Sequence, residues 1–278
     1  MKYNGTFMNL SGQLIYRVIP KAACSTVGNL LYFIDNNKFY NGDFHTLKEG
    51  FHNWSFPISK EQIQTKITEK ETIIFTSVRN PFKRIVSTYY DKIVGIQINN
   101  RLYRHKDVAF VKVLESKSIS RDQDIDHIKN FRKFVLFARD CVFYDKPFKS
   151  DFHWSRQHRM VNSLLRNYVL YDYIVHTETI IPQLKTILSR IKPTYPVDLD
   201  TMPKVNTSDD RISFEKPKYE DHFDDMSIAL IQEMYEMDFD YFHYDINNPS
   251  NFMPLREVDV EEYYYTFLKL VGCPKHLR

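Results

Sequence analysis

Three apolar, β-branched segments each run into a polar turn and then into a segment with helical periodicity. The apolar segments are residues 13–19, 72–78 and 171–176. Parallel strands need a crossover between them, and a helix usually supplies it, so this alternation favours a parallel sheet with helices packed on it. We therefore predict an α/β fold with a parallel sheet flanked by helices and interrupted by helical and loop insertions.

Capping residues indicate where the first helices begin. Ser25 and Thr26 are suited to cap a helix whose apolar positions repeat as far as residue 34. Asn80 is suited to cap a second helix, with Pro81 in its first position. Further helices are expected at residues 58–70, 126–139, 179–191 and 224–237. We interpret residues 1–278 as one domain, with residues 239–278 as a candidate C-terminal packing element.

Charge and cysteine content narrow the classes of function. The formal net charge is +3, from 38 basic and 35 acidic residues, which gives no reason to expect a nucleic-acid partner. Three scattered cysteines favour a reducing compartment over a disulfide framework. We see no secretory signal and no apolar run long enough for a transmembrane segment, so we expect a cytoplasmic protein. The oligomeric state is left open.

The turn after the first strand has the composition of an anion site. It reads Pro20-Lys21-Ala22-Ala23-Cys24-Ser25-Thr26. Unpaired N–H groups and the dipole at a helix N-terminus attract anions, and Lys21 adds a positive charge. The Walker pattern requires glycines that this turn lacks, so a P-loop kinase is disfavoured. The alternative is an ordinary strand–helix connection with a capping serine.

A second anion-binding group follows the second strand. Arg79 ends the strand, and Ser87 lies about two helical turns further on. A guanidinium can hold a phosphate through two parallel hydrogen bonds, and a hydroxyl can add a third. In the alternative interpretation, Arg79 is a surface residue and Ser87 is a tolerated serine within a helix. Arg84 is expected to be structural.

Taken in order, four segments of the chain resemble the carbohydrate sulfotransferases that use 3′-phosphoadenylyl sulfate (PAPS), the type-2 group with the chondroitin and HNK-1 enzymes. Residues 20–25 resemble the loop that binds the 5′-phosphosulfate, and residues 78–89 resemble the motif that binds the 3′-phosphate. The other two segments are His153-Trp154-x-x-Gln157 with Tyr171-Asp172-Tyr173-Ile174 and Glu178, and Val205-Asn206-Thr207-Ser208 with the aromatic run from Tyr235 to Tyr244. Asn80 departs from the pattern, since the family usually has an acidic residue there. The resemblance fits a bacterial member and implies a P-loop-like sheet.

The resemblance also implies a reaction, in which the sulfuryl group moves from PAPS to a hydroxyl of a carbohydrate or glycoconjugate acceptor. Lys21 would neutralise the leaving oxygen, and no metal ion would be needed. The residues expected to bind the donor are Lys21, Ala22, Ala23, Cys24, Ser25, Thr26, Arg79 and Ser87. The competing hypothesis is a non-catalytic module that binds PAPS or adenosine 3′,5′-bisphosphate. A lysine at the leaving-group position favours catalysis.

A general base is needed to take the proton of the attacking hydroxyl, and histidine is the usual carrier near neutral pH. His52 is the first choice, because it lies between the two donor motifs, where related sulfotransferases place a catalytic histidine or glutamate. His45 and Glu49 share that segment. His153 is the rival, because it begins the third resembling segment. Any one of these histidines could instead be a packed aromatic side chain.

Overall fold

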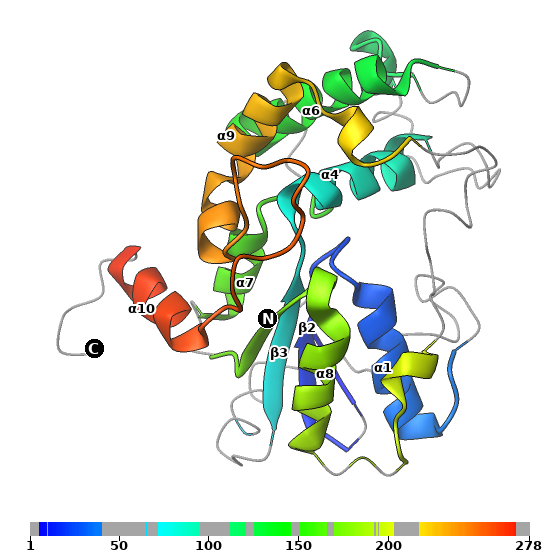
Figure 1. Ribbon diagram of the computed structural model, residues 1–278, viewed down its shortest axis with the longest axis vertical. Helices are drawn as coiled ribbons and strands as arrows, with labels where there is room; N and C mark the ends of the chain where they lie inside the picture. The colour runs from blue at the N-terminus through cyan, green and yellow to red at the C-terminus, as the bar shows by residue number, and fades with distance from the viewer. Residues whose placement is uncertain are drawn as a thin grey trace.

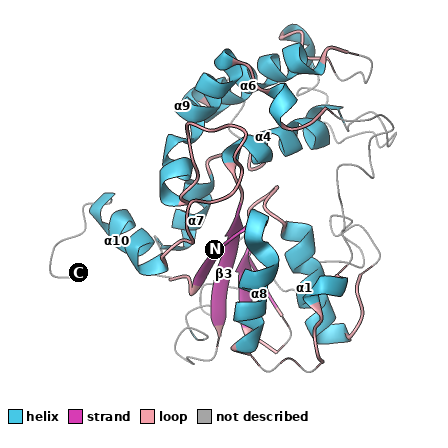
Figure 2. Ribbon diagram, in the orientation of Figure 1, coloured by secondary structure: helices cyan, strands magenta, loops and turns pink. Residues whose placement is uncertain are grey.

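The computed structural model describes residues 6–9, 11–40, 65, 72–94, 112–120, 125–145, 151–165, 170–191, 193, 195–202 and 217–270. Within them the chain forms a small sheet covered by helices, which confirms the predicted α/β class (Figure 1). Helices account for most of the regular structure (Figure 2).

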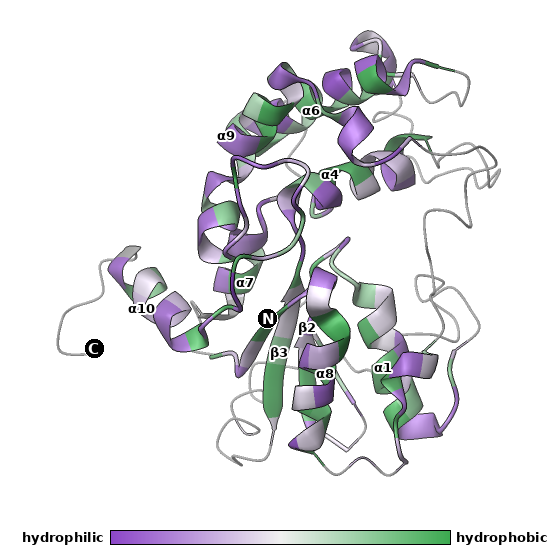
Figure 3. Cartoon of the chain, in the orientation of Figure 1, coloured by the Kyte–Doolittle hydropathy of each residue, from purple (hydrophilic) through white to green (hydrophobic). Residues whose placement is uncertain are grey.

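The sheet has four strands in the order β1 (Thr6–Met8), β2 (Leu14–Arg17), β3 (Ile73–Val78) and β4 (Tyr173–His176). β2, β3 and β4 run parallel, as predicted, whereas β1 pairs with β2 in the antiparallel direction. β1 was not predicted, because three residues are too few to show an alternating pattern. β3 is buried along its whole length, and Figure 3 colours much of it as hydrophobic.

Several α-helices accompany the sheet in the described part of the chain, seven of them with defined bounds. They are α1 (Cys24–Asn36), α4 (Pro81–Tyr89), α6 (His127–Tyr144), α7 (Gln157–Leu165), α8 (Ile180–Ser189), α9 (Asp225–Tyr241) and α10 (Val260–Leu270). The helices predicted at 126–139, 179–191 and 224–237 correspond to α6, α8 and α9. α7 and α10 were not predicted. Apart from Thr65, the helix predicted at 58–70 lies outside the described residues.

Successive side chains of each strand point to opposite faces of the sheet, and the core accordingly consists of two clusters. Tyr16 and Phe75 pack with α1 and α8. Ile15 and Ile74 belong to the other cluster, which contains apolar residues of α4, α6 and α9. Figure 1 shows these three helices beyond the upper end of β3, from which the chain continues directly into α4. The carboxyl ends of the parallel strands therefore meet a layer of helices.

Of the two helix N-caps predicted from the sequence, the structure confirms one and contradicts the other. Asn80 caps α4 as predicted, because its side chain accepts a hydrogen bond of 2.9 Å from the Phe82 N–H. The prediction for α1 is wrong. Its N-cap is Ala23, in a left-handed conformation, and Ser25 and Thr26 lie inside the first turn. The helix starts earlier because Lys21 and Ala23, with φ of 68° and 58°, reverse the chain within a tight turn.

The C-terminal part of the chain contributes α10, which lies in the segment suggested as a packing element. Tyr263 and Phe267 of this helix are buried in the same cluster as α9. The Tyr263 hydroxyl also donates a hydrogen bond of 2.8 Å to Asn162 of α7. None of the helices in the described ranges combines the length and apolar character that a membrane crossing requires.

Candidate active site

Two turns that follow neighbouring parallel strands lie against each other. Lys21 follows β2, and Arg79 follows β3. The Arg79 guanidinium donates a hydrogen bond of 3.2 Å to the carbonyl oxygen of Lys21. Ligands of α/β folds bind outside the carboxyl ends of such strands. The structure thus brings together the two positively charged residues that the sequence pattern singled out.

Hydroxyl groups from the sheet stabilise the Lys21 turn through hydrogen bonds. Ser77 of β3 donates a short hydrogen bond to the Ala22 carbonyl, and the Tyr16 hydroxyl lies 2.7 Å from the Ser77 hydroxyl. Ala22 is fully buried. The turn contains no glycine, although two of its residues have positive φ. Cys24, Ser25 and Thr26 start α1 directly after it, so their N–H groups lie at the helix end that attracts anions.

Arg84 joins this turn to a second segment of the site. Its side chain is almost fully buried and donates hydrogen bonds to three backbone carbonyls: 3.0 Å to Pro20, 2.7 Å to Ser155 and 2.8 Å to Phe152. Pro20 begins the Lys21 turn, and residues 152–155 carry His153. Arg84 is therefore structural, as expected, and fixes the distance between two groups of candidate residues.

Replacing Arg84 by methionine should lower the free energy of unfolding by about 2–3 kcal/mol, because buried carbonyl groups would lose their donors. Urea denaturation measures this difference. Arg139→Met is the matched control, since Arg139 pairs with Glu233 at the surface and should change stability by less than about 0.5 kcal/mol. Equal stability of the wild type and the Arg84 variant would contradict the role given to Arg84.

The Lys21 ammonium pairs with a carboxylate that the sequence pattern did not indicate. Lys21 Nζ lies 2.7 Å from Asp91 Oδ2, and Lys92 Nζ lies 3.2 Å from the same oxygen. Asp91 and Lys92 belong to a π-helical turn, Tyr90–Val94, that continues α4. Burial lowers the pKa of Lys21, whereas Asp91 opposes this shift. No local pattern marks a π-turn, so the sequence alone gave no reason to choose Asp91.

Arg79 has the surroundings of a residue that binds a ligand. Its backbone exchanges two hydrogen bonds with the Gln157 side chain, of 2.9 and 2.7 Å, which fixes its position. The guanidinium donates a bond of 3.3 Å to the Tyr219 hydroxyl. Arg79 Nε, however, is buried and has no hydrogen-bond partner among the described residues. A buried donor without a partner costs about 1–3 kcal/mol, which a bound anion would offset.

Aromatic rings and a second cation lie beside Arg79. Lys83 Nζ is 4.7 Å from the ring centre of Phe252 and 5.8 Å from that of Tyr219. Tyr219 and Phe252 were not predicted as site residues, because they come from distant parts of the chain. Ser87, which was predicted to join Arg79, is nearly buried in α4. No hydrogen bond between Ser87 and Arg79 is present in the described part of the structure.

Two acidic residues, from the third and fourth segments that the sequence comparison singled out, accept hydrogen bonds close to these turns. Glu178 accepts a hydrogen bond of 3.2 Å from the Asn80 N–H and one of 2.7 Å from the Tyr244 hydroxyl. Asp238 is fully buried and accepts hydrogen bonds from the N–H groups of Gln157 and His158, of 2.7 and 2.9 Å. These contacts fix the start of α4 and the start of α7. Residues 205–208 lie outside the described ranges.

His153 is paired with a carboxylate, an arrangement that would orient it if it acts as a general base. Its Nδ1 forms a short hydrogen bond with Asp151, and its carbonyl accepts a bond of 2.9 Å from Thr88. With Nδ1–H donated to the carboxylate, the lone pair lies on Nε2. Burial lowers the pKa of His153, the charges of Lys92 and Lys21 lower it further, and Asp151 opposes the shift. Burial and the two lysines thus favour the neutral imidazole, and the charge of Lys21 acts on it directly.

Three other residues are candidates for the general base, and one further histidine lies at the end of β4. His52, His45 and Glu49 lie outside the described residues, so their place relative to the turns stays a prediction. His176, at the end of β4, is fully buried and bonded to the Phe242 carbonyl at 2.9 Å. Burial lowers the pKa of His176 to about 4. It is a packed core histidine rather than a proton carrier.

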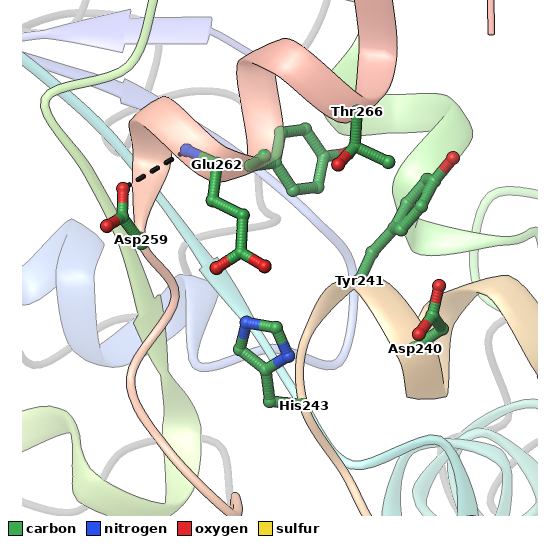
Figure 4. Close-up of a pocket in the computed structure, with 7 residues that line it drawn as sticks. Asp240, Tyr241, His243, Asp259, Glu262 and Thr266 are labelled. Atoms are coloured by element: carbon green, nitrogen blue, oxygen red, sulfur yellow. Dashed lines mark hydrogen bonds between the residues drawn. The ribbon is translucent and has the colours of Figure 1, made fainter. Parts of the chain in front are cut away.

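A small cavity of about 60 Å³ lies at the C-terminal end of α9, beside α10 (Figure 4). Asp259 uses its carboxylate to accept hydrogen bonds from the first N–H groups of α10, of 2.9 Å from Glu261 and 3.1 Å from Glu262. Glu262 pairs with Arg256. The cavity contains none of the predicted site residues. Across the described ranges, no three histidine, cysteine, aspartate or glutamate side chains are grouped so as to hold a metal ion.

Comparison with known proteins gives one match. A family model described as "Sulfotransferase family" matches residues 4–245, which is most of the chain and includes the Lys21 turn, Arg79 and His153. No curated protein and no solved structure matches.

Proposed function

The chain belongs to the sulfotransferase family, and we propose that it transfers the sulfuryl group of PAPS to a hydroxyl of a carbohydrate or glycoconjugate. The contact between Lys21 and Arg79 is the observation that carries this proposal. Because the two turns adjoin, one nucleotide could place its phosphosulfate on the Lys21 turn and its 3′-phosphate on Arg79. The buried Nε of Arg79, which has no hydrogen-bond partner among the described residues, supports an anion there.

In the proposed reaction, the acceptor oxygen attacks sulfur while the bond from sulfur to the bridging oxygen of the adenylate phosphate breaks. The leaving oxygen becomes negative, and the Lys21 ammonium stabilises that charge. The backbone amides of residues 22–26 and the hydroxyls of Ser25 and Thr26 hold the phosphosulfate, and Arg79 with Ser87 holds the 3′-phosphate. The acceptor proton passes to Nε2 of His153, which Asp151 orients through Nδ1. His52 remains the alternative base.

Screening labelled PAPS against free sugars and lipid-linked glycans tests the proposal directly. Transfer of label to a carbohydrate hydroxyl supports it. Tight binding of PAPS or adenosine 3′,5′-bisphosphate without transfer to any acceptor would favour the non-catalytic module instead. Labelling of a non-carbohydrate hydroxyl would retain the reaction and correct the acceptor class.

Replacing Arg79 by alanine should weaken the binding of adenosine 3′,5′-bisphosphate by roughly 1.5–3 kcal/mol, the usual range for a hydrogen bond to a charged group. Calorimetry measures this change. AMP, which lacks the 3′-phosphate, should bind far more weakly to the wild type and be little affected by the substitution. Arg139→Ala, which removes a surface guanidinium on α6, serves as the control. Equal affinity of the wild type for the bisphosphate and AMP would contradict the assignment of Arg79.

A further inference from the structure

The π-helical turn at the end of α4 brings a carboxylate to the Lys21 turn. α4 ends at Tyr89, and the turn Tyr90–Val94 follows without interruption. Tyr90, Ile93 and Val94 are buried in the core, which fixes the turn. π-turns within helices are frequent at functional sites, because the extra residue redirects the side chains that follow. Here the redirected residues are Asp91 and Lys92.

Within the described ranges, Asp91 supplies the carboxylate that pairs with Lys21. Its Oδ2 atom lies 2.7 Å from Lys21 Nζ, and the two side chains are only 7% and 19% exposed. A pair this sheltered from water is weakly screened by salt. Removing one partner of such a pair leaves the other charge uncompensated in the protein. The charge state and the position of the Lys21 ammonium therefore depend on Asp91.

Other charged and titratable groups also surround Lys21. Lys92 comes from the same π-turn, Cys24 from the start of α1, and His153 from the turn before α7. Burial lowers the pKa of Lys21 and Lys92 lowers it further, whereas Asp91 is the main group that raises it. Asp91 thus counteracts the lowering of the Lys21 pKa by burial and by Lys92.

We propose that Asp91 is a positioning residue of the transfer reaction. It holds the charged Lys21 ammonium beside the turn that would bind the phosphosulfate. This inference rests on the proposed function, because it assumes that Lys21 stabilises the leaving oxygen. Asp91 acts only through Lys21 and does not contact the donor. Its role is to place a positive charge before the reaction, so that little reorganisation is needed as the leaving oxygen becomes negative.

Asp91→Asn keeps the size of the side chain and removes its charge. Turnover should fall by about 10- to 100-fold, the scale expected when a catalytic group is misplaced. Affinity for adenosine 3′,5′-bisphosphate should be unchanged or higher, because a negative charge near an anionic ligand is lost. Lys21 acts in its protonated form, so a lower pKa shifts the alkaline loss of turnover to lower pH. Asp91→Glu, which restores the carboxylate, should recover part of the turnover.

The matched control is Asp200→Asn. Asp200 also pairs with a lysine at 2.7 Å, but this pair is exposed, so its loss should change neither turnover nor the pH profile. A parallel fall in bisphosphate affinity and unfolding temperature in Asp91→Asn would indicate a merely structural residue and overturn the inference.

NMR of protein with carbon-labelled lysine follows the titration of Lys21 without any acceptor, with Lys21→Ala used to assign the signal. A lower pKa of Lys21 in Asp91→Asn is the expected result, and an unchanged pKa would overturn the inference. This measurement separates the two proposals. If the pKa falls but no acceptor is ever sulfated, the proposed function fails while the pairing stands. If Lys21→Ala abolishes transfer but Asp91→Asn leaves turnover and pKa unchanged, only the inference about Asp91 fails.

Discussion

Replacing Lys21 by alanine is expected to lower turnover by about 10²–10³-fold, the effect of removing one group that stabilises a developing negative charge. Affinity for the donor should change much less, because the backbone amides of the turn and Arg79 remain. Turnover at saturating donor and calorimetry with adenosine 3′,5′-bisphosphate measure the two effects separately. Lys185→Ala, which removes an exposed lysine paired with Asp200, should change neither.

The opposite result would reassign Lys21. If Lys21→Ala turned over normally and only bound the donor more weakly, the lysine would hold the phosphosulfate without taking part in the chemical step. Equal losses of turnover and of bisphosphate affinity would instead indicate that the turn has collapsed. The unfolding temperature of the variant distinguishes collapse from a local effect.

Replacing His153 by alanine is expected to lower turnover by about 10²–10⁴-fold, the usual contribution of a general base. The base must be neutral, so turnover should rise with pH through the pKa of His153. Burial and the two nearby lysines place this rise below the value of about 6.5 typical of histidine. In Asp151→Asn the rise should move to still lower pH, because the carboxylate that supports the protonated form is lost. Measuring turnover against pH tests both statements.

His52→Ala should be prepared in parallel, because the sequence favoured His52. Normal turnover in His52→Ala with a large loss in His153→Ala assigns the base to His153, and the reverse assigns it to His52. His243→Ala is the control, since this histidine lines the cavity of Figure 4, which contains none of the site residues. In either outcome the proposed donor site is unaffected.

The three parallel strands and the start of α4 could be predicted from local sequence patterns. β2, β3 and β4 are runs of apolar and β-branched residues followed by turns, and α4 begins with a recognisable Asn-Pro cap. β1 and the start of α1 could not be predicted. β1 is a short edge strand defined by its pairing with β2. The start of α1 is set by positive φ angles at Lys21 and Ala23, which are not typical of either residue type.

Part of the candidate site could likewise be predicted from the sequence, and part could not. Lys21 and Arg79 could be identified because each follows a strand and has an anion-binding side chain. Asp91, Tyr219 and Phe252 could not, since their relation to those two residues depends on a π-turn and on contacts over long stretches of chain. His153 was predicted only as the rival of His52, with His45 and Glu49 as further candidates. Its pairing with Asp151, two residues earlier, could have been suspected from the sequence Asp-x-His.

The glycine-free turn at Lys21 has a consequence for how quickly a donor can be bound and released. A left-handed conformation costs a residue with a β-carbon about 1–2 kcal/mol, and here Lys21 and Ala23 both adopt it. That cost, and the loss of conformational entropy of the turn, arise during folding. A glycine-rich loop would keep much of its freedom until the ligand orders it. This turn instead presents its amides in one arrangement beforehand, so donor exchange should not wait for a loop to rearrange.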